Sequence, residues 1–143
     1  MTNAELKTLR ERLGLSVDWL AGQVGVAPRT VQYWEGGRTG FNVRVPEDVA
    51  ELLRSIDAIF DQCVKNALNT ISAVEKKQGV SPSDILLVRY KHEDDLYDAH
   101  PEFAELNLPV TAHGAMIGRV AKILYDREIP VTINFFRNET ENA

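Results

Sequence analysis

Three histidines and one cysteine are the residues of this sequence whose types could support metal binding or nucleophilic catalysis. His92, His100 and His113 are separated by eight and thirteen residues. Zinc-protease sites instead place two histidines four residues apart on one helix. Cys63 stands on an apolar helical stripe with no basic residue one turn away on that face, so nothing there would activate its thiol. The sequence predicts no metal site, no cofactor and no enzymatic activity, and we expect a solvated acidic loop at 92–95.

A second set of residues, in the segment 17–36, has the spacing that two short helices joined by a sharp turn require. Ala21 is small where the second helix would cross the first. Gly25 follows it by four residues and tolerates the positive φ of a tight turn. Val31 and Trp34 are one turn apart, which places both on the buried side of the second helix. Together these positions predict a helix-turn-helix.

The stretch Leu6–Glu35 resembles the lambda-repressor/Cro-like (XRE) helix-turn-helix family. The layout of the whole chain more narrowly resembles the YdiL-like relatives of anti-CRISPR-associated repressors, which join such a head to a C-terminal dimerisation region. The resemblance implies double-stranded DNA as the partner and a recognition helix, residues 28–36, in the major groove. It is carried by Leu6-Lys7-Thr8-Leu9-Arg10, Gly14-Leu15-Ser16, Leu20-Ala21 and Gly25-Val26-Ala27-Pro28-Arg29-Thr30-Val31-Gln32-Tyr33-Trp34-Glu35-Gly36.

The expected recognition helix carries a polar face. At 100° per residue, Arg29 and Tyr33 lie about 160° and about 200° from Val31, so both project away from the core. Gln32 lies beside them. We expect Arg29 to read guanine and Gln32 to read adenine at base edges, and Tyr33 to contact a thymine methyl group or a phosphate. Thr30 is expected to support them through a phosphate or a base contact.

Phosphate contacts are expected around these base contacts. Arg38, Thr39 and Arg44 follow the recognition helix, where members of the family often touch the DNA backbone. Ser16 and Val17 begin the second helix, whose free N–H groups can bind a phosphate. Many family members have glutamine at the position of Val17. Valine lacks the amide, so the side-chain contact of those members is not expected here.

The resemblance also implies a structural ion pair between Arg10 and Glu35, joining the first helix of the motif to the third. Removing one partner would leave the other partly buried without a counter-charge, at a cost of about 3 kcal/mol or more. Arg10 is therefore assigned to the fold and not to DNA.

Charge is unevenly distributed along the 143 residues. The net charge of −5 divides into +2 for residues 1–45 and −7 for the remainder. An acidic body would be repelled by DNA, so only the basic head would dock. Hydrophobic residues make up 44% of the chain, and none of their runs approaches the roughly 20 residues that cross a bilayer. We expect a cytoplasmic protein.

The fold is expected to be mainly α, with a small β-α-β region near the C-terminus. Residues 1–45 would form the helix-turn-helix head, residues 46–79 a long connecting helix and residues 80–143 a dimerisation region. Positions 46–78 contain neither glycine nor proline and carry an apolar stripe at helical spacing, which predicts one helix. Two shorter helices, broken near 66–69, are the alternative.

Shorter elements and caps complete the expected fold. Asn3 and Ser16 are expected to cap the first two helices, and Pro28 to begin the third. The remaining expectations are a buried strand at 85–90, an acidic loop at 91–108 with a helical turn at 102–106, a helix at 109–127, a strand at 129–136 and a frayed tail at 137–143.

These features favour a homodimeric transcriptional regulator that acts as a repressor on an inverted repeat. Regulation of its own operon is a further hypothesis. The half-sites of the repeat would lie about 34 Å apart or a multiple of that distance. The long helix and the strand at 129–136 are the candidate dimer interfaces. One alternative is an antitoxin whose C-terminal region binds a toxin, and another is an enzyme or small-molecule sensor with its site in residues 80–143. The sequence leaves open whether RNA binds as well.

Overall fold

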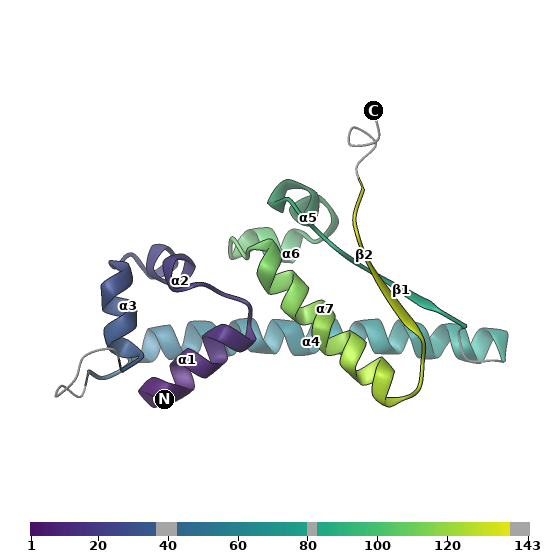
Figure 1. Cartoon of the computed structure of the whole chain (residues 1–143), viewed down its shortest axis with the longest axis horizontal. Coiled ribbons are helices and arrows are strands. Elements are labelled where there is room, and N and C mark those ends of the chain that lie inside the picture. Colours follow the sequence, from purple (N-terminus) through teal and green to yellow (C-terminus); the bar gives the residue numbers. More distant parts are fainter. Residues whose placement is uncertain (37–42, 80–82, 138–143) are drawn as a thin grey trace. The chain divides into compact units, whose positions relative to one another are not determined.

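The computed structural model describes residues 1–36, 43–79 and 83–137, which form two compact units (Figure 1). Residues 1–59 make up the first unit and residues 60–143 the second. Helix α4, Glu47–Gln78, is continuous, and the division between the units falls within it. The prediction of one long helix is therefore confirmed, and the alternative of a break near 66–69 is wrong.

Three short helices precede α4 in the first unit: α1 (Asn3–Arg12), α2 (Val17–Val24) and α3 (Pro28–Trp34). The Ser16 hydroxyl accepts a hydrogen bond from the Trp19 N–H at 2.9 Å and so caps α2. Gly25 ends α2 in the left-handed conformation, with φ of 76°. The predicted cap, turn and Pro28 helix start are confirmed. Each of these features depends on the local backbone, which favours particular residue types at that position.

The start of α1 differs from the prediction. Thr2, and not Asn3, is the N-cap: its hydroxyl accepts from the Glu5 N–H at 3.1 Å, while its own N–H donates to the Glu5 carboxylate at 2.7 Å. The amide of Asn3 instead donates to the backbone carbonyls of Trp34 and Val43, tying α1 to the end of α3 and to the segment before α4. These partners are distant in sequence, so local pattern could not indicate them.

The second unit contains a two-stranded parallel sheet and three further helices. Strands β1 (Ile85–Arg89) and β2 (Val131–Phe135) pair in parallel, with Ile85 opposite Val131 and Arg89 opposite Phe135. Parallel strands need a crossover connection, and the intervening helices provide it. These helices are α5 (Glu93–Ala99), α6 (Pro101–Glu105) and α7 (Val110–Asp126). The predicted mainly α fold with a small β-α-β region is confirmed.

Two expectations for the second unit are wrong. Residues 93–95 form the first turn of α5 and not a loop, because all three are acidic and the helix dipole favours negative charge at this end. Leu96 then buries completely and anchors the helix. Strand β1 is only half-buried, and Leu86 is 58% exposed. Residues 138–143, where fraying was expected, lie outside the described residues.

The core of the second unit is built around α7 and the part of α4 that belongs to this unit. The rings of Phe60 and Phe103 stack with centroids 5.8 Å apart, and Leu108 and Leu124 are fully buried. The guanidinium of Arg119 donates to the Asp61 carboxylate at 3.2 Å. Within the described residues, no helix combines the length and hydrophobicity that crossing a bilayer requires.

Candidate nucleic-acid interface

Helix α3 is fixed to the first unit by one side and leaves the opposite side in solvent. Val31 is fully buried and Trp34 is 8% exposed. Arg29 and Gln32 are exposed, and Tyr33 is half-buried. Arg29 and Tyr33 are four residues apart on the helix and Gln32 is three from Arg29, so the three side chains share one face. This face offers a guanidinium, an amide and a phenol.

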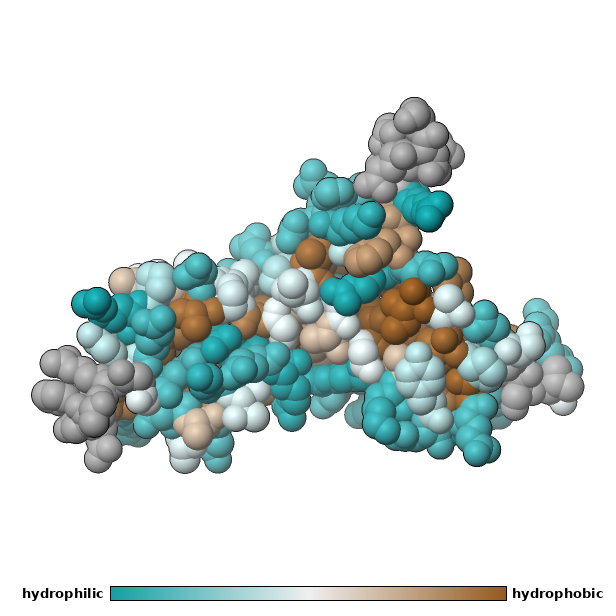
Figure 2. All heavy atoms as spheres, in the orientation of Figure 1, coloured by the Kyte–Doolittle hydropathy of each residue, from teal (hydrophilic) through white to brown (hydrophobic). Residues whose placement is uncertain are grey.

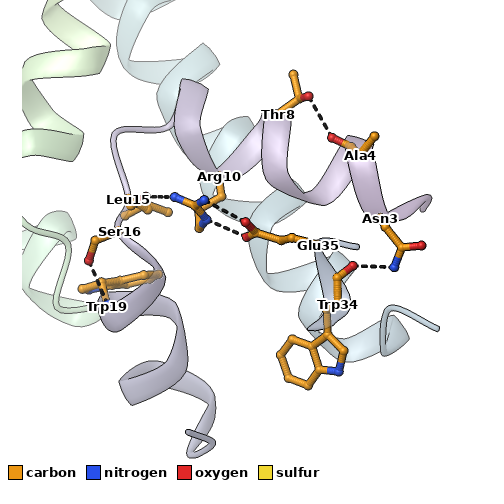
Figure 3. Close-up of polar contacts among 9 residues, drawn as sticks. All are labelled: Asn3, Ala4, Thr8, Arg10, Leu15, Ser16, Trp19, Trp34 and Glu35. Atoms are coloured by element: carbon orange, nitrogen blue, oxygen red, sulfur yellow. Dashed lines mark hydrogen bonds and ion pairs between the residues drawn. The ribbon is translucent and has the colours of Figure 1, made fainter. Parts of the chain in front are cut away.

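The ends of the helix-turn-helix are joined by a buried ion pair (Figure 3). Arg10 donates through Nε and Nη2 to the two carboxylate oxygens of Glu35, at 2.7 and 2.8 Å. Its Nη1 donates to the backbone carbonyl of Leu15 at 2.8 Å. The hydrogen bonds to Glu35 raise the pKa of Arg10 above its usual value. The structure thus brings together the two residues expected to pair, and Nε, Nη1 and Nη2 of Arg10 are all engaged in hydrogen bonds within the first unit.

A hollow of about 440 Å³ lies beside this ion pair. Its lining includes Lys7 on α1, Val17 at the start of α2 and Gln32 on α3. The side chain of Lys7 is exposed. A cation, a helix N-terminus and an expected base-reading residue therefore border the same concave surface. Lys7 was not among the residues predicted from the sequence to contact DNA. The sequence indicated only that Lys7 lies one helical turn before Arg10 on α1, and so on the same side of that helix.

The other residues expected to contact phosphate differ in how exposed they are. Ser16 is exposed, and its hydroxyl accepts from the Trp19 N–H, which leaves the hydroxyl proton able to donate to a phosphate. Thr30 is half-buried on α3, and Arg44 is exposed ahead of α4. Arg38 and Thr39 lie outside the described residues.

The residues considered for metal or nucleophile chemistry do not form such a site in the described part of the chain. No group of three or more histidine, cysteine, aspartate or glutamate side chains there could hold a metal ion. Cys63 is half-buried on α4, and burial raises the pKa of its thiol, which disfavours the nucleophilic thiolate. His113 is buried within α7, at 1% exposure.

Comparison with known proteins identifies the N-terminal segment. Residues 4–58 match the helix-turn-helix domain family. The chain is 33% identical over 78 residues to the Aca2 repressor of Pectobacterium phage ZF40. These residues are 54% of this chain and 58% of the relative, so the chain spans little more than half of that protein's length. The predicted resemblance to XRE-like helix-turn-helix domains is confirmed for this segment.

Proposed function

The chain carries an XRE-like helix-turn-helix domain at residues 4–58, and from this premise we propose that it is a DNA-binding transcriptional regulator acting as a repressor. The observation that carries the proposal is the polar face of α3. Val31 and Trp34 fix the helix, while Arg29 and Gln32 remain exposed on its other side. A helix presented in this way can enter the major groove, where base pairs differ in their donors and acceptors.

Each residue of this face suits a particular base contact. The guanidinium of Arg29 matches the O6 and N7 acceptors of guanine. The amide of Gln32 can donate to N7 and accept from the amino group of adenine. Tyr33 is half-buried, so its ring supports the helix while its outer edge contacts a thymine methyl group or a phosphate.

Phosphate binding is assigned to the groups that surround α3. Val17, the first residue of α2, lines the hollow that Lys7 also borders, and Ser16 precedes it as the N-cap. A phosphate in this hollow would be attracted by both the helix dipole and the ammonium group. Thr30 and Arg44 are assigned further phosphate contacts. Arg38 and Thr39 are kept as phosphate contacts on the sequence alone.

The second unit is proposed to hold two copies together, so that two heads reach the two halves of an inverted repeat. Four exposed hydrophobic side chains lie on or next to the sheet: Leu86, Ile133, Phe135 and Phe136 are 58%, 40%, 49% and 39% exposed. Figure 2 shows hydrophobic atoms at the surface in the region where Figure 1 draws β1 and β2. A two-stranded sheet also leaves two edges unpaired, and an open edge readily pairs with another strand.

Helix α4 is a second candidate for the contact between copies. Its residues 65–78 include none that is buried, although Leu68, Ile71 and Val74 continue the apolar stripe. The sheet exposes larger side chains than this part of α4, so we place the principal contact at the sheet and a secondary one at α4. Regulation of its own operon is part of the same proposal.

A selection from random DNA duplexes tests this function. The full chain is mixed with the pool, bound duplexes are recovered, and the enriched sequences are compared. We expect an inverted repeat whose half-sites are centred one helical turn apart, or a multiple of it, since a two-fold dimer presents two equivalent helices. Enrichment of a single unrepeated half-site would contradict the dimer, and no enrichment would contradict the assignment to DNA.

A further inference from the structure

His113 lies in the second unit at the centre of a cluster of rings. The centroids of Tyr90, His100 and Phe103 are 5.2, 5.0 and 5.3 Å from the centroid of His113. The side chain is 1% exposed, yet its Nδ1 has no hydrogen-bond partner within the described residues. Leaving a buried polar atom unpaired is costly, so such an atom requires an explanation.

A cavity of about 420 Å³ adjoins this cluster, and both His100 and His113 line it. The remaining wall is mostly apolar, with Ala67 from α4 and Met116 and Val120 from α7 among its residues. The volume falls within the range of small-molecule sites, which combine an apolar wall with a few polar groups that fix orientation. His113, whose Nδ1 is unpaired, and His100 are polar residues of this wall.

Charges around the cavity select the kind of molecule that fits. Burial, together with the charges of His100 and Arg89, lowers the pKa of His113 to about 4, so its imidazole is neutral at pH 7. The Arg89 guanidinium can pack against Gly114, the neighbour of His113, because glycine has no Cβ. A Cβ at position 114 would lie 2.3 Å from Nη2 of Arg89. Arg89 is not part of the cavity wall, but its charge acts on His113 and disfavours a cationic ligand there. Glu102, which lines the cavity and lies 3.5 Å from the Nδ1 of His100, disfavours an anionic one.

A hydroxyl group is the neutral partner that fits best. Either tautomer of a neutral imidazole can be satisfied by it, because a hydroxyl both donates and accepts. An aromatic body suits the surrounding rings, which favour offset or edge-to-face contacts.

We propose that this cavity binds a small neutral aromatic molecule bearing a hydroxyl group, which hydrogen-bonds to Nδ1 of His113. The site belongs to the second unit alone and goes beyond the proposed binding of DNA. It gives the regulator a place where a small molecule would contact α4, the helix that both units share.

Phenol is the probe. Toluene, which has the ring without the hydroxyl, and benzoate, which has the ring with a negative charge, are the matched controls. The imidazole ¹⁵N resonances of the full chain are followed by NMR during each titration. We expect phenol to shift the Nδ1 resonance of His113 saturably and to leave that of the exposed His92 in place. Toluene should bind about tenfold more weakly, the effect of losing one hydrogen bond to a buried group. Benzoate should not shift His113.

Two alanines on α4 supply the matched variants. Ala67→Leu fills the cavity and should abolish the phenol-dependent shift, whereas Ala73→Leu alters an exposed position and should preserve it. A shift that survives Ala67→Leu overturns the proposal. Two results with the unmodified chain would also overturn the proposal: an Nδ1 resonance of His113 that phenol does not shift, and equal binding of phenol, toluene and benzoate. DNA binding is measured separately by gel retardation, so failure of this site leaves the proposed function untouched.

Discussion

The two compact units differ in the surface that each leaves exposed. Among the described residues, every exposed large hydrophobic side chain belongs to the second unit: Val74, Leu86, Tyr125, Ile133, Phe135 and Phe136. The first unit buries or half-buries its large apolar side chains and exposes Arg29 and Gln32 on α3. A polar, cationic face suits a charged partner such as DNA, while an apolar face suits another protein surface. The exposed face of α3 is therefore the proposed DNA-binding surface, and the exposed hydrophobic side chains of the sheet form the proposed assembly surface between two copies.

The largest effect is expected from the buried ion pair that holds the first unit together. Arg10→Ala leaves the Glu35 carboxylate buried without its partner and should lower the free energy of unfolding by about 3–5 kcal/mol. Urea denaturation measures it. Arg54→Ala removes an exposed pair with Glu47 and should cost about 1 kcal/mol or less. Equal costs for the two variants would show that burial does not distinguish these pairs.

A pH effect is expected from the second unit. His113 has a pKa of about 4 when folded and an ordinary value of 6.5, so the unfolded chain takes up this proton first as pH falls. Stability from this group is complete above pH 6.5 and declines toward pH 4, by up to about 3 kcal/mol. His113→Phe should remove this part of the pH dependence of unfolding. An unchanged dependence would show that His113 is not the group responsible.

A moderate effect is expected at the assembly surface. Phe135→Ser removes an apolar side chain from the proposed contact between copies and should weaken self-association by about 2 kcal/mol. Sedimentation equilibrium measures it. Tyr125→Ser alters a side chain that is similarly exposed but lies outside the sheet, and it should leave association unchanged. If both variants associate as the unmodified chain does, the sheet is not the interface.

The smallest effect is expected from a single phosphate contact. Lys7→Ala should reduce the slope of log K against log salt by about 0.9 for each head bound, without changing which sequence is preferred. Lys65→Ala, at an exposed position of α4 in the second unit, is the control and should keep the full slope. A change in sequence preference with Lys7→Ala would place this residue among the base contacts instead.

Much of the first unit was predictable because its turns make local demands. Ser16 caps α2, Gly25 adopts a positive φ and Pro28 begins α3, and only a few residue types favour each of these roles. The role of Asn3 was not predictable, since its partners Trp34 and Val43 are 31 and 40 residues away.

The second unit was less predictable because its stability depends on tertiary contacts. The acidic composition at the start of α5 indicated a loop, but complete burial of Leu96 makes this segment a helix. The phenol of Tyr97 adds a hydrogen bond to the Leu108 carbonyl at 2.9 Å. The burial of His113 had no signal in its own sequence neighbourhood, as the rings around it come from several elements.

The most direct test of the account compares base selection by the unmodified chain with that by Arg29→Ala and by Arg127→Ala, an exposed arginine of the second unit. The account predicts that Arg29→Ala loses about 1–3 kcal/mol of discrimination at one guanine of each half-site, whereas Arg127→Ala selects as the unmodified chain does. Unchanged selectivity in Arg29→Ala would contradict the claim that this face of α3 reads DNA.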